Sequence, residues 1–179
     1  MSNKDIVVDK KQSVIFEKAG NSTDSALAAV FVPTGYDEYT SSAYSSLLGQ
    51  IVQPWFYNQL RTEEQLGYAV FAFPMSVGRQ WGMGFLLQSN DKQPSFLWER
   101  YKAFFPTAEA KLDDEARRVC ANPAGGNTQM QAPQTLGEEA SKLSKDFDRG
   151  NMRFDSRDKI VAQIKLLTPQ NLLISSIRR

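Results

Sequence analysis

Apolar side chains recur at spacings of three and four along four stretches of the chain, which predicts four amphipathic helices. The expected helices span residues 36–65, 94–112, 135–150 and 155–173. The widest apolar stripe belongs to the first helix and consists of Tyr44, Leu47, Leu48, Ile51, Val52, Trp55 and Phe56. The second helix has a similar stripe of Leu97, Trp98, Tyr101, Phe104 and Phe105. Both helices are therefore expected to face a hydrophobic core.

Residues that cap or interrupt helices suggest where these helices begin, bend and end. Asp37 or Thr40 is placed to cap the start of the first helix. Pro54 lies inside it and should kink the helix or split it in two. Pro106 should end or kink the second helix, and Gly150 should end the third.

Shorter runs of β-branched, aromatic and small apolar residues predict strands at residues 13–20, 25–35, 68–73 and 81–89. The second run is apolar almost throughout, which is typical of a strand buried on both faces. The last two runs flank residues 74–80. We expect them to form an antiparallel hairpin with a loop longer than the tight two-residue kind.

The element order β-β-α-β-β-α-α-α predicts an α+β fold with helices packed on one face of an antiparallel sheet. No linker, repeat or charge run interrupts the sequence, so we expect residues 1–179 to form a single domain. Gly82 and Gly84 lie inside the last predicted strand, which indicates a bulge or the close approach of another backbone.

Composition and charge exclude several kinds of partner. The 179 residues are 41% hydrophobic and 23% charged, as in globular proteins. Lys and Arg number 21 against 20 acidic residues, and this net charge of +1 gives no reason to expect nucleic acid or an acidic membrane as partner. No apolar run approaches the roughly 18 residues of a membrane span. The charged N-terminus has no apolar segment of a secretion signal.

The chain contains no histidine, and this absence limits its chemistry. The chain alone cannot build a zinc site with His ligands, a Ser-His-Asp triad or a Cys-His pair. The single cysteine, Cys120, cannot form an internal disulfide, and we interpret it as incidental.

The segment "LRTEEQLGYAVF" combines a helix end, a glycine and a strand start. Arg61 and Tyr68 flank Gly67 in this corner. A guanidinium and a phenol are both hydrogen-bond donors, and a corner can aim both at one carbonyl oxygen. The alternative is that Arg61 lies on a solvated helix end and Tyr68 is a half-buried strand residue.

Glu63 and Glu64 lie beside Arg61 and could form an acid–base pair. Neighbouring residues on a helix point about 100° apart, however. We therefore interpret both carboxylates as solvated helix surface.

At this corner the sequence resembles the C-terminal domain of pitrilysin-type zinc metallopeptidases, the inverzincins of the insulin-degrading enzyme group. The resemblance rests on the string R-T-x-E-Q-L-G-Y at residues 61–68, the hairpin ending in "GFLLQS" and the helix containing "ER". It covers most of residues 2–112 and 129–170.

The resemblance implies a metallopeptidase-like fold of the kind found in LuxS and in mitochondrial processing peptidase. It further implies a parent enzyme of four related α+β domains that enclose a peptide in a chamber. Its first domain holds zinc through an H-x-x-E-H motif. The fourth domain, which this chain resembles, binds no cofactor and no metal.

Further implications of the resemblance concern partners and site residues. Arg61 and Tyr68 match the positions that hold the substrate backbone and stabilise the oxyanion. The implied partners are the N-terminal zinc-bearing half of the parent and a peptide substrate, without nucleic acid or membrane. The implied location of the parent is the periplasm. By this interpretation the chain is inactive alone.

Two stretches depart from the family pattern, residues 113–128 and 171–179. Pro123, Gly125 and Gly126 would interrupt any helix in the first stretch. The second stretch would leave the domain incomplete at its C-terminus. We interpret both as products of reading-frame shifts, with genuine or engineered changes as the alternative. Two other interpretations of the whole chain stay open: a non-catalytic scaffold or interaction domain, and a product of a damaged gene without function.

Overall fold

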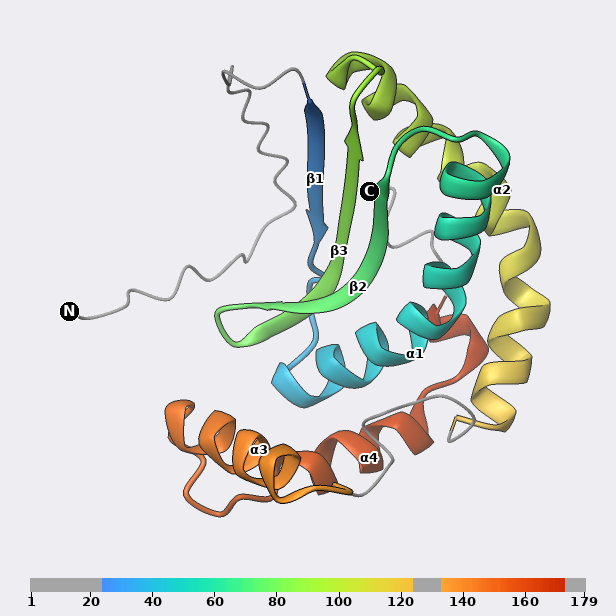
Figure 1. Ribbon diagram of the computed structural model, residues 1–179. Coiled ribbons are helices and arrows are strands. Elements are labelled where there is room, and N and C mark those ends of the chain that lie inside the picture. Colours follow the sequence, from blue (N-terminus) through green and yellow to red (C-terminus); the bar gives the residue numbers. More distant parts are fainter. Residues whose placement is uncertain (1–23, 124–132, 173–179) are drawn as a thin grey trace.

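A computed structural model describes residues 24–123 and 133–172 (Figure 1). The strands are β1 (Ser25–Phe31), β2 (Ala69–Val77) and β3 (Gln80–Ser89). The helices are α1 (Glu38–Tyr57), the π-helix η1 (Asn58–Glu63), α2 (Pro94–Ala121), α3 (Leu136–Asp148), α4 (Ser156–Leu166) and the 3₁₀-helix η2 (Pro169–Leu172). The predicted strand at residues 13–20 lies outside the described residues, as do residues 124–128 and 173–179 of the two departing stretches.

The strands form an antiparallel sheet in the order β1-β3-β2. The predicted hairpin is present, but the prediction of a long loop was wrong. β2 extends to Val77, which pairs with Gln80, so only Gly78 and Arg79 form the turn. Gly78 has a φ of 60°, which suits the first central position of a type II′ turn. This turn matches the twist of the two strands, and residues 74–77 therefore remain paired instead of looping out.

The prediction that residues 25–35 form a strand buried on both faces was also wrong. β1 alternates between half-buried and exposed side chains, and it pairs only with β3 within the described part of the sheet. Small apolar residues, among them Ala26 and Ala28, lie on the open face of the sheet. They make the run apolar throughout, and the run therefore resembled a strand with both faces buried. The helices cover only the other face.

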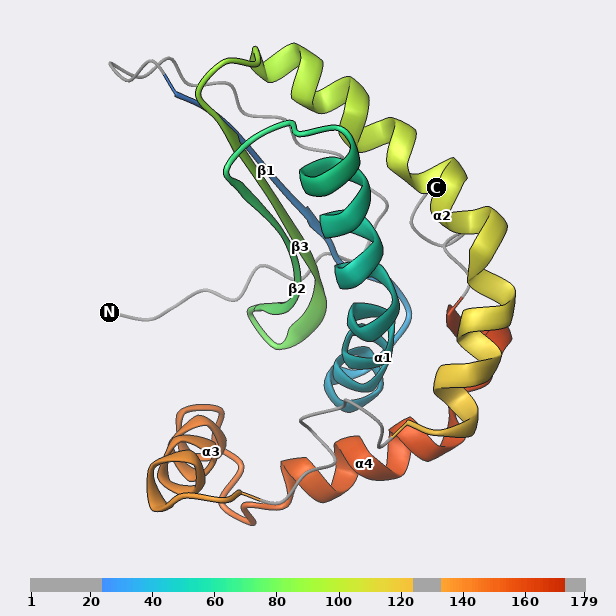
Figure 2. The ribbon, with the colours of Figure 1, turned by 45° about the vertical axis from the view of Figure 1, so that its right-hand side comes forward.

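Helices α1 and α2 pack on one face of the sheet, as Figure 2 shows from the side. The ring of Phe56 on α1 lies 5.2 Å from that of Phe85 on β3 and 5.1 Å from that of Phe104 on α2. These rings lie at the centre of the core, where aromatic pairs add to the free energy of apolar burial. The predicted α+β architecture is confirmed.

Helix α1 begins where predicted, because Asp37 accepts a hydrogen bond of 2.7 Å from the backbone N–H of Thr40. Pro54 does not split it: the helix is continuous to Tyr57, although it changes direction between its ends in Figure 1. The predicted apolar stripe is buried, except that Trp55 is only partly covered.

Helix α2 continues well beyond its predicted end at residue 112. Pro106 does not end it, and the helix includes the first part of the departing stretch as far as Ala121. A proline inside a helix costs about 3 kcal/mol. Burial of Leu112, Ala116 and Val119 on the face that continues the core stripe more than offsets this cost. The predicted end of this helix at residue 112 was therefore wrong.

The last two helices lie close to their predicted ranges. Thr135 caps α3 by accepting a hydrogen bond of 3.2 Å from the N–H of Glu138. Gly150 follows α3 with a φ of 74°, as expected of a helix-ending glycine. Helix α4 is shorter than predicted, because Pro169 prevents the chain from continuing as a regular helix.

Candidate functional site

Arg61 lies in the π-helix η1, at the end of α1. The wider turns of η1 are visible in its hydrogen bonds: the Glu64 N–H donates to the carbonyl of Gln59, and the Leu66 N–H donates to that of Leu60, both at 2.9 Å. Such turns occur often at functional sites. The Arg61 side chain is half-buried, and no hydrogen bond or ion pair engages it among the described residues.

The corner between η1 and β2 is tightly packed against β3. Gln65 has a φ of 50°, a left-handed conformation that is uncommon for a residue with a side chain. A Cβ atom on Gly67 would come within 2.0 Å of the carbonyl oxygen of Gln88. The Tyr68 N–H donates to that same oxygen at 3.1 Å. Only glycine fits at position 67, and its fit sets where β2 begins.

Tyr68 lies at the start of β2 with about half of its surface exposed (50%). Its hydroxyl donates a hydrogen bond of 2.7 Å to a carboxylate oxygen of Asp24, at the start of β1. The Asp24 carboxylate raises the pKa of the Tyr68 phenol, because it accepts the proton that ionisation would remove. Tyr68 is thus already placed as a donor to a negatively charged oxygen.

Glu64 does not lie on a solvated helix surface, so that prediction was wrong. Its carboxylate accepts two hydrogen bonds of 2.7 Å from the Arg100 guanidinium, one at each oxygen, and a third of 3.0 Å from Gln59. Arg100 lowers the pKa of this carboxyl group. Glu63 points elsewhere and accepts from the exposed Asn58 at 2.7 Å. The two carboxylates therefore diverge, as their spacing predicted.

Arg61 and Tyr68 are thus placed at the two ends of one rigid corner, but no direct hydrogen bond joins them within the described chain. The sequence interpretation missed Asp24 and Arg100, which bind Tyr68 and Glu64. These partners are 44 and 36 residues away along the chain. No local pattern could have identified them.

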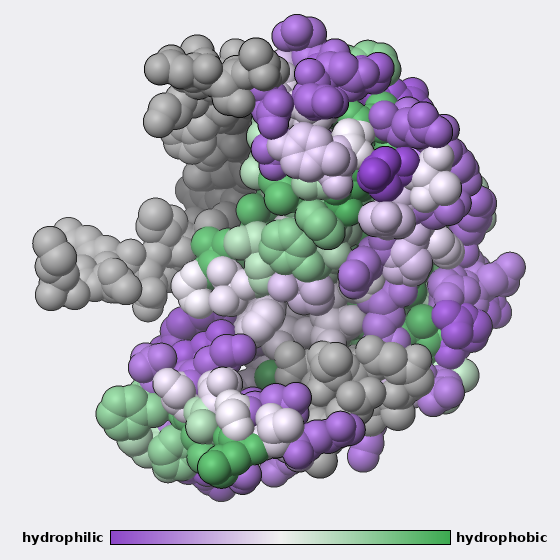
Figure 3. Space-filling view, viewed as in Figure 1, coloured by the Kyte–Doolittle hydropathy of each residue, from purple (hydrophilic) through white to green (hydrophobic). Residues whose placement is uncertain are grey.

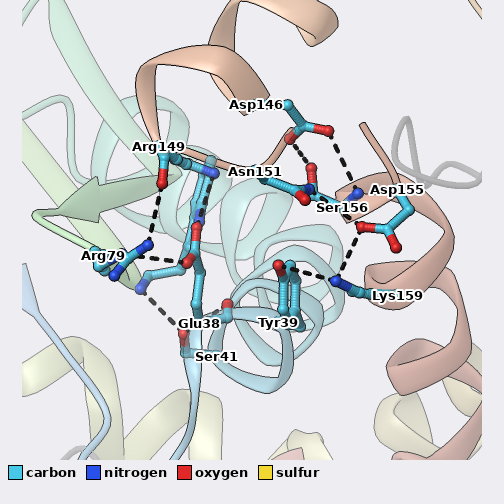
Figure 4. A network of polar contacts seen from close by, with 11 residues as sticks. Glu38, Tyr39, Ser41, Arg79, Asp146, Arg149, Asn151, Asp155, Ser156 and Lys159 are labelled. Carbon is cyan, nitrogen blue, oxygen red and sulfur yellow. Dashed lines mark hydrogen bonds and ion pairs between the residues drawn. The ribbon is translucent and has the colours of Figure 1, made fainter. Parts of the chain in front are cut away.

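A polar pocket of about 180 Å³ lies near the hairpin turn, at the other end of β2 (Figure 4). The nine residues of β2 separate it from Tyr68, a span of roughly 30 Å. Its two arginines are engaged: Arg149 lies 3.3 Å from Glu38, and Arg79 donates to the carbonyl of Arg149 at 3.1 Å. We interpret these contacts as structural, because they hold the connection between α3 and α4 against α1. The pocket is not part of the candidate site at residues 61–68.

Apolar side chains gather over the open face of the sheet in the view of Figure 3. Four of them are between 37% and 50% exposed: Val30, Phe71, Phe73 and Val77. Phe71 and Phe73 lie on β2, the strand that Tyr68 immediately precedes. The strand that follows Tyr68 therefore presents an apolar surface on the open face of the sheet.

Neither a metal cluster nor a membrane helix occurs in the described ranges. Residues 24–123 and 133–172 contain no group of three or more His, Cys, Asp or Glu side chains that could hold a metal ion. None of their helices is both long and apolar enough to cross a membrane.

Comparison with known proteins identifies relatives over most of the chain. A family described as "PQQ synthase PqqF-like, C-terminal lobe domain 4" matches residues 47–144. The chain is 88% identical to Protease 3 of Escherichia coli over 174 residues, which covers 95% of this chain and 18% of that protein. Human insulin-degrading enzyme is 28% identical over 146 residues, covering 80% of this chain and 14% of its own length.

A solved structure supports the same relationship. The crystal structure of pitrilysin superposes with a TM-score of 0.79 at 84% identity, over 93% of this chain and 18% of that chain. This chain thus spans about a fifth of the length of its bacterial relatives. It belongs to the family of pitrilysin-type metallopeptidases, and residues 47–144 match domain 4 of the C-terminal lobe.

Proposed function

We propose that this chain is the substrate-binding and chamber-closing domain of a zinc metallopeptidase. The observation that carries the proposal is the corner at residues 61–68, which holds two hydrogen-bond donors on one rigid turn. The Arg61 guanidinium is unengaged within the described chain, and the Tyr68 hydroxyl already donates to a carboxylate oxygen. A peptide carbonyl that becomes an oxyanion needs donors of this kind.

In the assembled enzyme, zinc held by another domain would supply the activated water. Arg61 would hold a backbone carbonyl of the substrate, and Tyr68 would donate its hydroxyl hydrogen to the developing oxyanion. The apolar side chains of Phe71 and Phe73 would receive neighbouring apolar side chains of the peptide. The implied partner is the zinc-bearing N-terminal half of the parent. By the same resemblance, we infer a periplasmic location.

The test uses a chimera in which this chain replaces the matching portion of Protease 3 from Escherichia coli. Cleavage of a quenched fluorescent peptide is measured for the chimera, for the isolated chain, and with a metal chelator present. We expect activity in the chimera, none in the isolated chain, and loss of activity with the chelator. Cleavage by the isolated chain would refute the mechanism.

The roles of the two donors are tested in the same chimera. Arg61→Ala and Tyr68→Phe should each lower kcat/KM by about 10²-fold or more, as removal of an oxyanion donor does. Arg117→Ala and Tyr39→Phe are the matched controls, because both residues lie outside the corner. Unchanged activity in both site variants would refute the assigned roles.

A second candidate function is a non-catalytic interaction domain. The exposed apolar side chains of α3, Leu136, Leu143 and Phe147, favour it, because such a stripe normally packs against a partner. This function predicts that the Arg61 and Tyr68 variants are neutral, whereas Leu143→Ser weakens assembly with the rest of the enzyme. The two candidate functions therefore predict different effects of the Arg61 and Tyr68 substitutions on peptide cleavage.

A further inference from the structure

The hydrogen bond between Tyr68 and Asp24 bears directly on how the site would work. Asp24 immediately precedes β1, and Tyr68 immediately precedes β2. Ser25 pairs with Ser89, and Ala69 pairs with Gln88, so both residues lie at the same end of the sheet on opposite sides of β3. The Tyr68 hydroxyl reaches across β3 to Asp24 at 2.7 Å.

A phenol has one hydroxyl hydrogen and can make one strong donated hydrogen bond at a time. In this chain Asp24 takes that hydrogen bond. In this arrangement, a substrate oxyanion can accept from Tyr68 only when Asp24 releases the hydroxyl.

The contact can be exchanged without opening the core. Tyr68 is 50% exposed, and Asp24 is only half-buried. Water competes for an exposed hydrogen bond and reduces its net contribution, so a tightly held oxyanion can displace the carboxylate.

We propose that Asp24 competes with the substrate oxyanion for the hydroxyl hydrogen of Tyr68. Asp24 thus acts through Tyr68 and restrains the site until a peptide is held in place. This inference rests on the proposed function, because it requires Tyr68 to donate to the oxyanion.

The test is a double-mutant cycle in the chimera. Asp24→Asn keeps the shape of the side chain but removes its charge, and Asp24→Ala removes the acceptor altogether. We expect kcat/KM to rise in the order wild type, Asp24→Asn, Asp24→Ala, with a total gain of about 2- to 10-fold. In a Tyr68→Phe background, the same Asp24 substitutions should leave kcat/KM unchanged, because no hydroxyl hydrogen remains to be released.

The control is Asp91→Asn, which removes a carboxylate from the same end of the sheet. Asp91 bonds Ser89 and Lys92. We expect no gain from it, so a gain equal to that of Asp24→Asn would assign the effect to charge alone and overturn the proposal. Melting temperatures of all variants show whether a loss of activity reflects unfolding, and the isosteric Asp24→Asn keeps the test valid if Asp24→Ala fails to fold.

The remaining outcomes separate the two proposals. A fall in kcat/KM for folded Asp24→Asn would mean that Asp24 orients Tyr68 for catalysis, which overturns the competition. A gain that persists in the Tyr68→Phe background would overturn it as well. If Tyr68→Phe alone has no effect, the proposed role of Tyr68 fails first, and the competition fails with it.

Discussion

Glu64 and Arg100 join the corner that carries Arg61 and Tyr68 to helix α2. Each oxygen of the Glu64 carboxylate accepts a hydrogen bond of 2.7 Å from the guanidinium. Such two-point pairs fix orientation as well as distance. Because Glu64 lies between Arg61 and Tyr68 in the chain, this pair restricts how far the corner can move relative to the core.

The pair should make stability depend on pH. Arg100 lowers the pKa of Glu64 below its ordinary value of 4.5, so this stabilisation is complete above that pH and is lost as the pH falls through the lowered pKa. Arg100 is 36% exposed, and solvent screening limits the gain to about 1 kcal/mol. Urea unfolding should show Glu64→Gln to be less stable than wild type at pH 7, with the difference shrinking toward pH 3. The exposed Asp113, changed to Asn, is the control, and an equal loss there would contradict the prediction.

Substitution of Gly67 should disturb both fold and site. An added Cβ would come within 2.0 Å of the Gln88 carbonyl oxygen, so β2 or β3 has to shift. We expect Gly67→Ala to lower the free energy of unfolding by about 1–3 kcal/mol or more. Gly137→Ala is the matched control: it meets no atom within 4 Å in helix α3 and should be neutral or stabilising by up to about 1 kcal/mol. Equal effects in thermal unfolding would contradict the described packing.

The two faces of the sheet should respond differently to loss of a phenylalanine. Phe85 faces the helices, where its ring lies 5.2 Å from that of Phe56, 5.4 Å from that of Tyr101 and 5.7 Å from that of Phe105. It is 1% exposed, so Phe85→Ala should cost about 3–5 kcal/mol. Phe71 is 50% exposed on the open face, and Phe71→Ala should cost less than about 1 kcal/mol. Denaturant midpoints of the two variants measure the contrast. Similar losses would mean that the open face is covered in solution.

Cys120 should react slowly in the folded chain. Its side chain packs partly against the core, and burial raises the pKa of its thiol, which leaves less of the reactive thiolate. We expect iodoacetamide at pH 8 to modify the native chain more slowly than the chain unfolded in urea. Since Cys120 is the only cysteine, total modification measures this site alone. Equal rates would show that the end of α2 is open.

Local patterns in the sequence were sufficient for much of the architecture. Spacings of three and four identified the core faces of α1 and α2, and the order of a helix end, Gly67 and a strand start identified the corner with Arg61 and Tyr68. These patterns involve residues within about one helical turn or one strand of each other, so they can be recognised in the sequence without knowledge of the fold. The absence of histidine likewise excluded a zinc site with His ligands from the sequence alone.

Only the tertiary structure decided which distant residues meet. The hairpin turn shortened to Gly78 and Arg79 because strand pairing extended β2, and α2 passed Pro106 because its later residues also reach the core. The partners of Tyr68 and Glu64 are likewise set by the sheet order and by the packing of α2. Contacts between residues dozens of positions apart form when the apolar faces of helices and strands are buried against each other. A local periodicity identifies each apolar face but does not show which side chains meet when the faces pack.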